Sequence, residues 1–354
     1  MIPKMERNRW EAGSEFHWQG VPGGPFFKWP EPHIMSASGR GSLLNIWKNI
    51  KNSSSKNLFV PDYFCQDVVE WWAKQGIVIK RYVDGPHLDA PSWKTLCPSR
   101  EDAVLAVNYF GVRDGNVWRQ WREANKRVIL IEDHSHDPLS DWALNSKADF
   151  VFASLRKTLP VPDGAILWSP KGLHLPEEPI SKEWQGSAYK LAAMILKKEY
   201  LNGADVILKD VFRDFQIKGE LLFGNEHCDA ASPWSKFLLS FGCPIGWRKT
   251  REENVRMFLD LMNWNPTVQP LFDKWPQNHC PFNAILVFPD KVFREKYRSR
   301  LIQANIYPSV HWVLNGIGSA DSVLLSDRIM TIPVDQRYSD EDIRRIAVAI
   351  LSEQ

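Results

Sequence analysis

The sequence predicts an α/β fold, in which helices flank a mostly parallel sheet, followed by a smaller α+β domain. From residue 57 to residue 170, short apolar stretches alternate with stretches of helical periodicity, and they are not joined by tight hairpin turns. Such strands need crossover connections and therefore run parallel. Farther along the chain, long amphipathic helices replace this alternation. We expect three parts: an N-terminal arm over residues 1–35, a large α/β domain over 36–235 and a small C-terminal α+β domain over 236–354.

The boundaries of the expected elements come from apolar spacing and from capping residues. Apolar residues recur at helical spacing from Leu43 to Ile50, so the first helix should begin near Arg40. Gly76 should end the second helix, and Ser339, followed by acidic residues, should cap the last one. The elements expected after the first helix are, in order, strand 57–61, helix 67–76, strands 77–83 and 103–111, helix 116–126, strands 127–133, 148–155 and 164–170, helices 182–201, 232–242 and 248–264, strand 282–288, helix 289–305, strands 306–312 and 327–334, and helix 339–354.

The N-terminal arm contains the stretch "WQGVPGGPFFKWPEP" (18–32). Its proline and glycine residues exclude a regular helix or a central strand. Its aromatic residues favour an arm that packs on a neighbouring surface, and direct contact with a substrate is the alternative.

Composition and charge narrow the possible functions. The chain has 44 Lys and Arg against 42 Asp and Glu, so its net charge of +2 gives no reason to expect a nucleic-acid or membrane partner. Five scattered cysteines without a CxxC spacing argue against a disulfide framework or a structural zinc site. The sequence has neither a long apolar run nor the apolar core of a signal peptide. We therefore expect a cytoplasmic protein that acts on small molecules.

One strand, "RVILIED", runs into the sequence Glu132-Asp133-His134-Ser135-His136-Asp137. Ligands of mostly parallel sheets bind at the carboxyl ends of the strands, so this cluster should face a site. Carboxylates and imidazoles could hold a metal ion in a hydrolase, form a hydrolytic relay, or hold an organic cofactor. The metal hypothesis, built on Asp133, His134 and His136, is disfavoured because no other His or Asp cluster in the sequence supplies a clear further ligand.

A lysine follows the next strand, in "DFVFASLRKTLPVPDG" (149–164). Burial at the edge of the sheet would favour the neutral amine of Lys157, which can form a Schiff base with an aldehyde. Pyridoxal phosphate needs such an amine, a carboxylate opposite its ring nitrogen and donors for its phosphate. Lys157 and Asp133 could supply the first two, while Ser154 and the helix start at Gly39, Arg40, Gly41 and Ser42 could bind the phosphate.

Six segments also resemble, in the same order, the sugar aminotransferases of the DegT/DnrJ/EryC1/StrS family, which are pyridoxal-phosphate enzymes of fold type I. The segments are "SGRGSLLNIW", "NLFVPDYFCQDVVEWWAKQGIVIKRYVD", "VLAVNYFGV", "VILIEDHSHDPL", "RKTREENVRMFLDL" and "IMTIPVDQRYSDEDIRRIAVAI". The resemblance covers most of the chain. It implies an aminotransferase, and a homodimer whose partner subunit completes each site.

The resemblance also implies a role for individual residues. Lys157 would bind the cofactor covalently and act as the catalytic base, and Asp133 would hold the ring nitrogen. His136 would lie near the ring, Tyr63 or Phe64 would cover one ring face, and Asn108 would lie near the ring hydroxyl. The chain departs from the family at Phe152, where a serine is usual, and in the loop "TLPVPDGA", which contains Asp163 and replaces flexible glycines.

The reaction implied is the transfer of an amino group from an amino acid, expected to be glutamate, to a keto-sugar. A nucleotide-linked sugar for surface polysaccharide or a glycosylated metabolite is the acceptor that the resemblance implies. Arg40, Arg156 and Lys249 are candidates to bind its diphosphate. The alternatives are a pyridoxal-phosphate enzyme of small keto or amino acids, the metal-dependent hydrolase, and an inactive relative kept as a binding protein.

Overall fold

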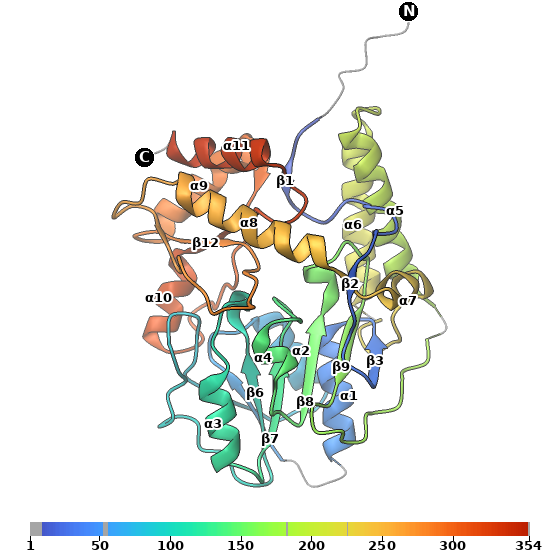
Figure 1. The fold of residues 1–354 in the computed structure, drawn as a ribbon, viewed down its shortest axis with the longest axis vertical. Helices are drawn as coiled ribbons and strands as arrows, with labels where there is room; N and C mark the ends of the chain where they lie inside the picture. The colour runs from blue at the N-terminus through green and yellow to red at the C-terminus, as the bar shows by residue number, and fades with distance from the viewer. Residues whose placement is uncertain (1–8, 52–55, 182, 225, 353–354) are drawn as a thin grey trace, which may run out of the picture.

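The computed structural model describes residues 9–51, 56–181, 183–224 and 226–352. Residues 1–8 of the expected arm therefore lie outside the described part. A seven-stranded sheet forms the centre of the molecule, in the order β3-β9-β8-β7-β6-β4-β5 (Figure 1). Its strands are β3 (His33–Ser36), β4 (Leu58–Pro61), β5 (Ile79–Tyr82), β6 (Ala103–Val107), β7 (Ile129–Asp133), β8 (Phe150–Ser154) and β9 (Ala165–Trp168).

Most neighbouring strands of this sheet are parallel, as predicted. Strands β5, β4, β6, β7 and β8 run parallel, whereas β9 is antiparallel to both β8 and β3. All five residues of β6 are buried, because alternate side chains enter two different cores. Leu105 packs in the core beneath α1 (Gly39–Lys51) and α2 (Gln66–Lys74), and Val104 packs in the core beneath α3 (Asn116–Ala124) and α4 (Asp141–Leu144). The predicted α/β class is confirmed.

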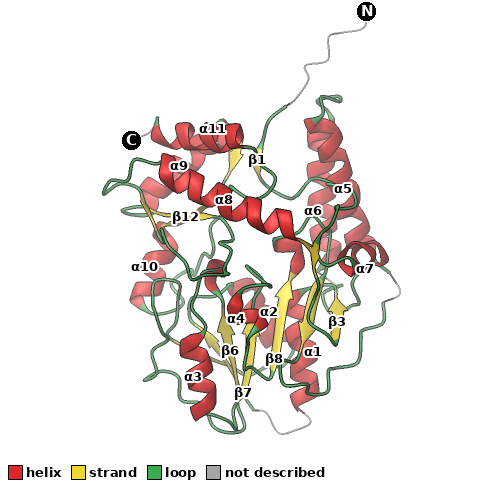
Figure 2. Ribbon diagram, in the orientation of Figure 1, coloured by secondary structure: helices red, strands yellow, loops and turns green. Residues whose placement is uncertain are grey.

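A smaller antiparallel sheet lies toward the C-terminus, in the order β11-β12-β14. It is packed with helices in a third core, at the top of Figure 2. Ser339 caps the last helix as predicted, because Ser339 and Asp342 form a reciprocal capping box. The elements of this region are α8 (Ile245–Leu261), β11 (Gln269–Pro270), β12 (Ala284–Val287), α9 (Lys291–Gln303), β13 (Ile306–Tyr307), α10 (Ala320–Arg328), β14 (Ile329–Ile332) and α11 (Asp340–Leu351).

A helical hairpin connects the two regions. Helices α5 (Gln185–Leu201) and α6 (Leu208–Phe223) pack along each other and stand apart at the right of Figure 1. Short helix α7 (Pro233–Ser240) follows, with Ser232 as its N-cap. The sequence predicted α5 and α7 but neither α6 nor α10. The predicted strand 306–312 is shorter in the structure, where β13 ends before Pro308, which has no backbone N–H to donate.

The N-terminal arm packs on its own chain. Strand β1 (Ala12–Gly13) pairs with β13, and β2 (Phe26–Phe27) pairs with β10 (Cys243–Pro244). Trp29 is buried and donates its indole N–H to the carbonyl oxygen of Leu239, at 2.7 Å. Trp29 is thus covered within its own chain, whereas Phe27 of the same arm is 36% exposed. The division into residues 1–35, 36–235 and 236–354 stays a prediction. Among the described residues, no helix has the length and apolar character to cross a membrane.

Candidate active site

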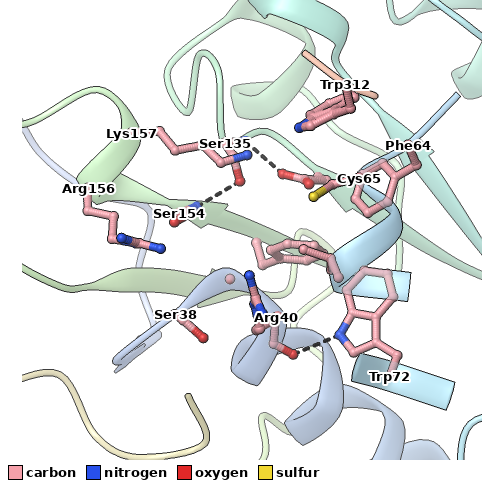
Figure 3. A pocket seen from close by; sticks show the side chains of 14 residues that line it. Ser38, Arg40, Phe64, Cys65, Trp72, Ser135, Ser154, Arg156, Lys157 and Trp312 are labelled. Atoms are coloured by element: carbon pink, nitrogen blue, oxygen red, sulfur yellow. Dashed lines mark hydrogen bonds between the residues drawn. The ribbon is translucent and has the colours of Figure 1, made fainter. Parts of the chain in front are cut away.

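A cavity lies where β7, β8 and the start of α1 meet. The carboxyl ends of β7 and β8 supply Asp133 and Ser154, and the first turn of α1 supplies its opposite wall. Figure 3 shows these side chains around a common space. The residues that line it are Ser38, Gly39, Arg40, Phe64, Cys65, Val68, Trp72, Asp133, Ser135, Phe152, Ser154, Arg156, Lys157 and Trp312.

Lys157 enters this cavity from a single 3₁₀ turn, Leu155–Lys157, directly after β8. Burial lowers the pKa of its amine, and the charges of Asp133 and Cys65 oppose that effect only in part. Its Nζ atom lies 5.7 Å from the centre of the Trp312 ring. Lys157 is therefore an amine that releases its proton more easily than an exposed lysine, which is the condition for reaction with an aldehyde.

Asp133, the last residue of β7, is held in place by Ser135. One carboxylate oxygen of Asp133 accepts a hydrogen bond from the backbone N–H of Ser135 at 2.8 Å. The Ser135 hydroxyl oxygen in turn accepts a hydrogen bond from the backbone N–H of Ser154 at 2.9 Å. Ser135 thereby joins the ends of β7 and β8 and fixes the carboxylate relative to the turn that carries Lys157. No local pattern in the sequence predicted this role of Ser135.

The opposite end of the cavity favours an anion. Gly39 approaches β8 closely, since a Cβ atom there would lie 3.2 Å from the Cβ of Ser154. Burial and the nearby charge of Arg156 both lower the pKa of Arg40, and no carboxylate of the described residues lies within ion-pair distance of Arg40. Arg156 and Arg40 point to the same end of the cavity in Figure 3. The amide groups at the start of α1 add a partial positive charge there.

Glu220 of α6 balances part of this positive charge. Its two carboxylate oxygens each accept a hydrogen bond from Arg156 at 3.3 Å, and it also pairs with Lys190 of α5. Burial acts to raise the pKa of Glu220, but Arg156 and Lys190 lower it to about 2. Glu220 is therefore ionised at pH 7, and the helical hairpin contributes it together with Lys190 beside the anion-binding end of the cavity.

Several predicted site residues lie outside the cavity lining. Gly41 packs against the carbonyl oxygen of His227, where a Cβ atom would be only 1.7 Å away. The Ser42 hydroxyl bonds to Ser36 at 2.6 Å. The Tyr63 hydroxyl donates to the carbonyl oxygen of His311 at 2.7 Å, so Phe64 is the aromatic residue of that loop which faces the cavity. The side-chain amide of Asn108 donates to Ser140 at 3.2 Å.

His136 also lies outside the lining. It is buried, and its Nδ1 accepts a hydrogen bond from the backbone N–H of Phe110 at 3.0 Å. The ring of Trp312 lies nearly parallel to it, at 5.8 Å between centroids, and lines the cavity. Trp312 comes from a segment far along the chain, and no local pattern in the sequence indicated that it reaches this site. The cofactor roles given to His136 and the other predicted residues stay predictions.

The cluster at the end of β7 does not converge on a metal site. His134 Nε2 shares a hydrogen bond with Glu132 at 3.0 Å, whereas Asp137 pairs with Arg248 at 2.9 Å. His136 lies among aromatic rings instead. Within the described ranges, no group of three or more His, Cys, Asp or Glu side chains is arranged to hold a metal ion. His134 and His136 therefore have different surroundings.

The proline-rich loop after Lys157 is buried from Thr158 to Gly164. Asp163 accepts hydrogen bonds from the backbone N–H and the hydroxyl of Ser232, at 2.8 and 2.6 Å, and from Ser235. The loop is therefore fixed to the start of α7. None of the residues from Thr158 to Gly164 lines the cavity around Asp133 and Ser154, or a second cavity that lies next to Lys157. Lys249, predicted to contact a nucleotide, is 74% exposed and pairs with Glu253. It does not line the cavity.

A second cavity adjoins Lys157, which lines both. Its walls carry mainly hydroxyl, amide and imidazole groups together with the buried ion pair of Asp335 and Arg337. Burial, and secondly the charge of Lys157, lower the pKa of His311 to about 3, so this imidazole is neutral at pH 7. The lining residues are Gly13, Ser14, Phe16, Lys157, Phe282, Asn283, Tyr307, Ser309, His311, Thr331, Pro333, Asp335 and Arg337.

No protein-family model and no curated protein sequence matches the chain. Solved structures do resemble it. The PLP form of a putative sugar aminotransferase, Spr1654 from Streptococcus pneumoniae, aligns over 91% of this chain and 88% of its own, with a TM-score of 0.60 and 13% identity.

Two further solved structures show the same likeness. Helicobacter pylori PseC, an aminotransferase involved in pseudoaminic acid biosynthesis, aligns over 90% of this chain and 86% of its own, with a TM-score of 0.60 and 12% identity. A DegT DnrJ EryC1 StrS aminotransferase from Brucella abortus aligns over 91% of this chain and 85% of its own, with a TM-score of 0.57 and 15% identity. The chain therefore has the fold of these enzymes, fold type I, as the sequence predicted.

Proposed function

We propose that this protein is a pyridoxal-phosphate-dependent aminotransferase. The observation that carries the proposal is that Lys157, Asp133 and an anion-binding end formed by Arg40 and Arg156 line one cavity. Nothing in the strand pattern alone requires a buried amine, a carboxylate and two arginines to meet. The shared fold with known aminotransferases supports the same conclusion.

The residues present fit this cofactor. An amine of lowered pKa suits its aldehyde, and the Asp133 carboxylate suits a protonated ring nitrogen. Arg40 lacks a carboxylate partner in the described part of the chain, and an added Cβ at Gly39 would crowd Ser154, so this end suits a phosphate dianion. Trp312 and Phe64 are two of the aromatic residues that line the cavity, and they are the candidates to cover the ring.

The side chains divide the chemistry among them. When bound, the cofactor would supply the electron sink that makes the α-proton of an amino acid acidic. Lys157, released as a neutral amine, would take that proton and return it at the other position, because its pKa is lowered by burial. Asp133, held by Ser135, would keep the ring nitrogen protonated. Arg40, Arg156 and Ser154 would fix the phosphate and thus the ring.

We propose a keto-sugar as acceptor and an amino acid, glutamate in the first instance, as donor. The hydroxyl, amide and neutral imidazole groups of the second cavity suit a hydroxylated substrate. Arg337 is an arginine of that lining, and it pairs with Asp335 at 2.7 Å. Nucleotide linkage, and a role in surface polysaccharide or a glycosylated metabolite, rest on the resemblance to the sugar aminotransferases.

The test is a spectrum followed by a substrate panel. Purified protein incubated with pyridoxal phosphate should develop a visible band that borohydride abolishes, and mass spectrometry should then find a pyridoxyl group on Lys157. A panel with glutamate as donor should pair nucleotide-linked and free keto-sugars with common keto acids. Absence of the band would overturn the proposal and favour the binding-protein hypothesis. A band with turnover of keto acids alone would overturn the sugar acceptor.

We also propose a cytoplasmic homodimer. All five cysteines are free thiols, which suits a reducing compartment. Ile217 and Leu221 of α6 are 61% and 73% exposed, one helical turn apart on either side of Glu220, which contacts Arg156 at the cavity. Exposed apolar side chains beside a site suit coverage by a second subunit.

A further inference from the structure

The N-terminal segment forms one wall of the second cavity. Gly13, Ser14 and Phe16 line it from one side, and Lys157 lines it from the large sheet. Figure 1 shows the blue segment around β1 passing between α11 and the α5–α6 hairpin. A stretch of chain remote in sequence from Lys157 thus lies beside the amine that would exchange amino groups.

Strand β13 and the residues before α11 hold this segment from one side. Ala12 donates its backbone N–H to the carbonyl oxygen of Asn305 at 2.9 Å, and Gly13 donates to the Tyr338 hydroxyl at 2.7 Å. Gly13 has a φ of +89°, and a Cβ atom there would lie 2.3 Å from the carbonyl oxygen of Tyr307. The close approach of segment and strand therefore requires glycine at this position.

Lys197 of α5 holds the segment from the other side. Its Nζ donates to the carbonyl oxygen of Glu15 at 2.8 Å and to that of Gly13 at 3.3 Å. Arg337 donates to the same Glu15 carbonyl oxygen at 3.3 Å. Lys197 is 1% exposed, so its ammonium group is kept out of water to make these two contacts. Such burial is costly, and within the described part of the chain both hydrogen bonds of Lys197 go to this segment.

We propose that the second cavity is the substrate-binding site and that the segment Ala12–Phe16, held by Lys197, is its outer wall. Lys197 is then a positioning residue for substrate and has no contact with the cofactor cavity. The proposal rests on the proposed function, since it takes Lys157 as the reacting amine. The ligand is the reacting end of the amino donor or keto acceptor, which would meet the Ser14 hydroxyl and His311, both of which line this cavity.

The matched variants follow from the two sides on which the segment is held. Lys197→Met keeps the length of the side chain and removes both hydrogen bonds, and Lys198→Met, at the next and partly exposed position of α5, is its control. Gly13→Ala strains the contact with Tyr307. Gly20→Ala is the control for strain, because Gly20 has a φ of +79° in the same arm but has nothing within 4 Å of the added Cβ.

Two measurements test whether the segment Ala12–Phe16 is held in place and covers the substrate side of Lys157. In the protein without cofactor, amide hydrogen exchange of residues 10–18 should be faster in Lys197→Met and Gly13→Ala than in either control. In the protein loaded with pyridoxal phosphate, methoxyamine, a small neutral probe that displaces Lys157 from the cofactor, should react about tenfold faster in those two variants. Their affinity for the cofactor should stay within about twofold of wild type, because the cofactor cavity is lined by other residues.

The outcomes separate the two proposals. Unchanged exchange in both variants would show that Lys197 and Gly13 do not hold the segment. Faster exchange with an unchanged methoxyamine rate would show that the segment does not cover the substrate side of Lys157. Either result overturns the inference while the wild-type band still supports the enzyme. A wild-type protein without the band overturns the proposed function instead. The KM of the best amino donor from the panel should rise about tenfold in Lys197→Met with little change in kcat.

Discussion

Lys157 is the residue on which the proposed chemistry depends. Replacing it by alanine removes a partly buried amine whose pKa is lowered by burial, and it leaves the backbone turn after β8 unchanged. We expect Lys157→Ala to lose transamination and the borohydride-sensitive band, with a thermal midpoint close to that of wild type. Absorption spectra, turnover and thermal unfolding measure these effects. Wild-type turnover in this variant would contradict the assignment of the amine.

Asp133 and Asp137 allow a comparison between a carboxylate that takes part in the chemistry and one that stabilises the fold. Asp133→Asn removes the negative charge opposite the ring nitrogen, so turnover should fall about 10²-fold or more while cofactor binding remains. Asp137 instead pairs with Arg248 and accepts a hydrogen bond from the Cys280 backbone at 2.8 Å. Asp137→Asn should therefore lower the thermal midpoint more than the turnover. Turnover of Asp133→Asn within a few-fold of wild type would mean that this carboxylate has another task.

Lys197 makes stability depend on pH. Burial, and then the charge of Arg337, lower its pKa from 10.5 to about 7, although Glu11, Glu15 and Asp335 oppose this. Between these two values the unfolded chain binds more protons than the folded one, so the free energy of unfolding should rise with pH. Below pH 7 the full cost of the buried charge is present. Urea unfolding at about pH 7 and pH 9 should show this rise in wild type and a smaller one in Lys197→Met.

At the scale of elements, the proline-rich loop after Lys157 is hydrogen-bonded to the start of α7. Asp163 is fully buried and accepts hydrogen bonds from the backbone N–H and the hydroxyl of Ser232, the N-cap of α7. Asp163→Ala leaves buried donors unpaired, so it should cost about 2–4 kcal/mol of stability. Asp205→Ala, which removes an exposed contact to the Ile207 backbone, is the control and should cost under about 0.5 kcal/mol. Equal losses in the two variants would show that the loop is not fixed through Asp163.

The elements that the sequence predicted are those whose pattern is local. Strand β6 is apolar throughout, and β7 and β8 are apolar until the polar residues at their carboxyl ends, because both faces of the sheet are covered; this pattern is visible in the sequence. Helix α6 was missed. Its apolar residues are divided between a buried side, with Phe212, and an exposed side, with Ile217, so no single apolar face indicates it.

The residues of the candidate site were likewise predicted only where a local pattern in the sequence indicated them. Gly39, Arg40, Asp133, Ser154 and Lys157 were predicted from strand ends and a helix start, and Phe64 was one of two aromatic residues implied by the family resemblance; all six line the cavity. Trp312 was missed because it reaches the cavity through a contact with His136 that spans much of the chain. Gly41 and Ser42 were included because a helix N-terminus offers several amides, yet packing against His227 and Ser36 turns them away from the cavity.

At the scale of the whole molecule, the exposed face of α6 gives a test of the proposed homodimer. Leu221→Asp places a charge on a 73% exposed apolar position beside Glu220, whereas Val348→Asp does the same at a 62% exposed position of α11 that lines neither cavity. A charge buried against a partner without a counter-ion would weaken association strongly, but on a solvated face it costs little. Sedimentation should show a wild-type dimer at micromolar concentration, a monomer for Leu221→Asp and a dimer for Val348→Asp.

Activity would then decide whether the dimer matters for the site. Glu220 contacts Arg156 at the anion-binding end, so a partner seated on this face of α6 would lie next to the cavity and limit the movement of both residues. The monomeric variant should therefore bind pyridoxal phosphate more weakly than wild type, and the affinity of wild type should fall on dilution below the dissociation constant of the dimer. A wild-type monomer with full cofactor affinity would contradict the dimer and leave Arg40 and Arg156 of one chain as sufficient to hold the phosphate.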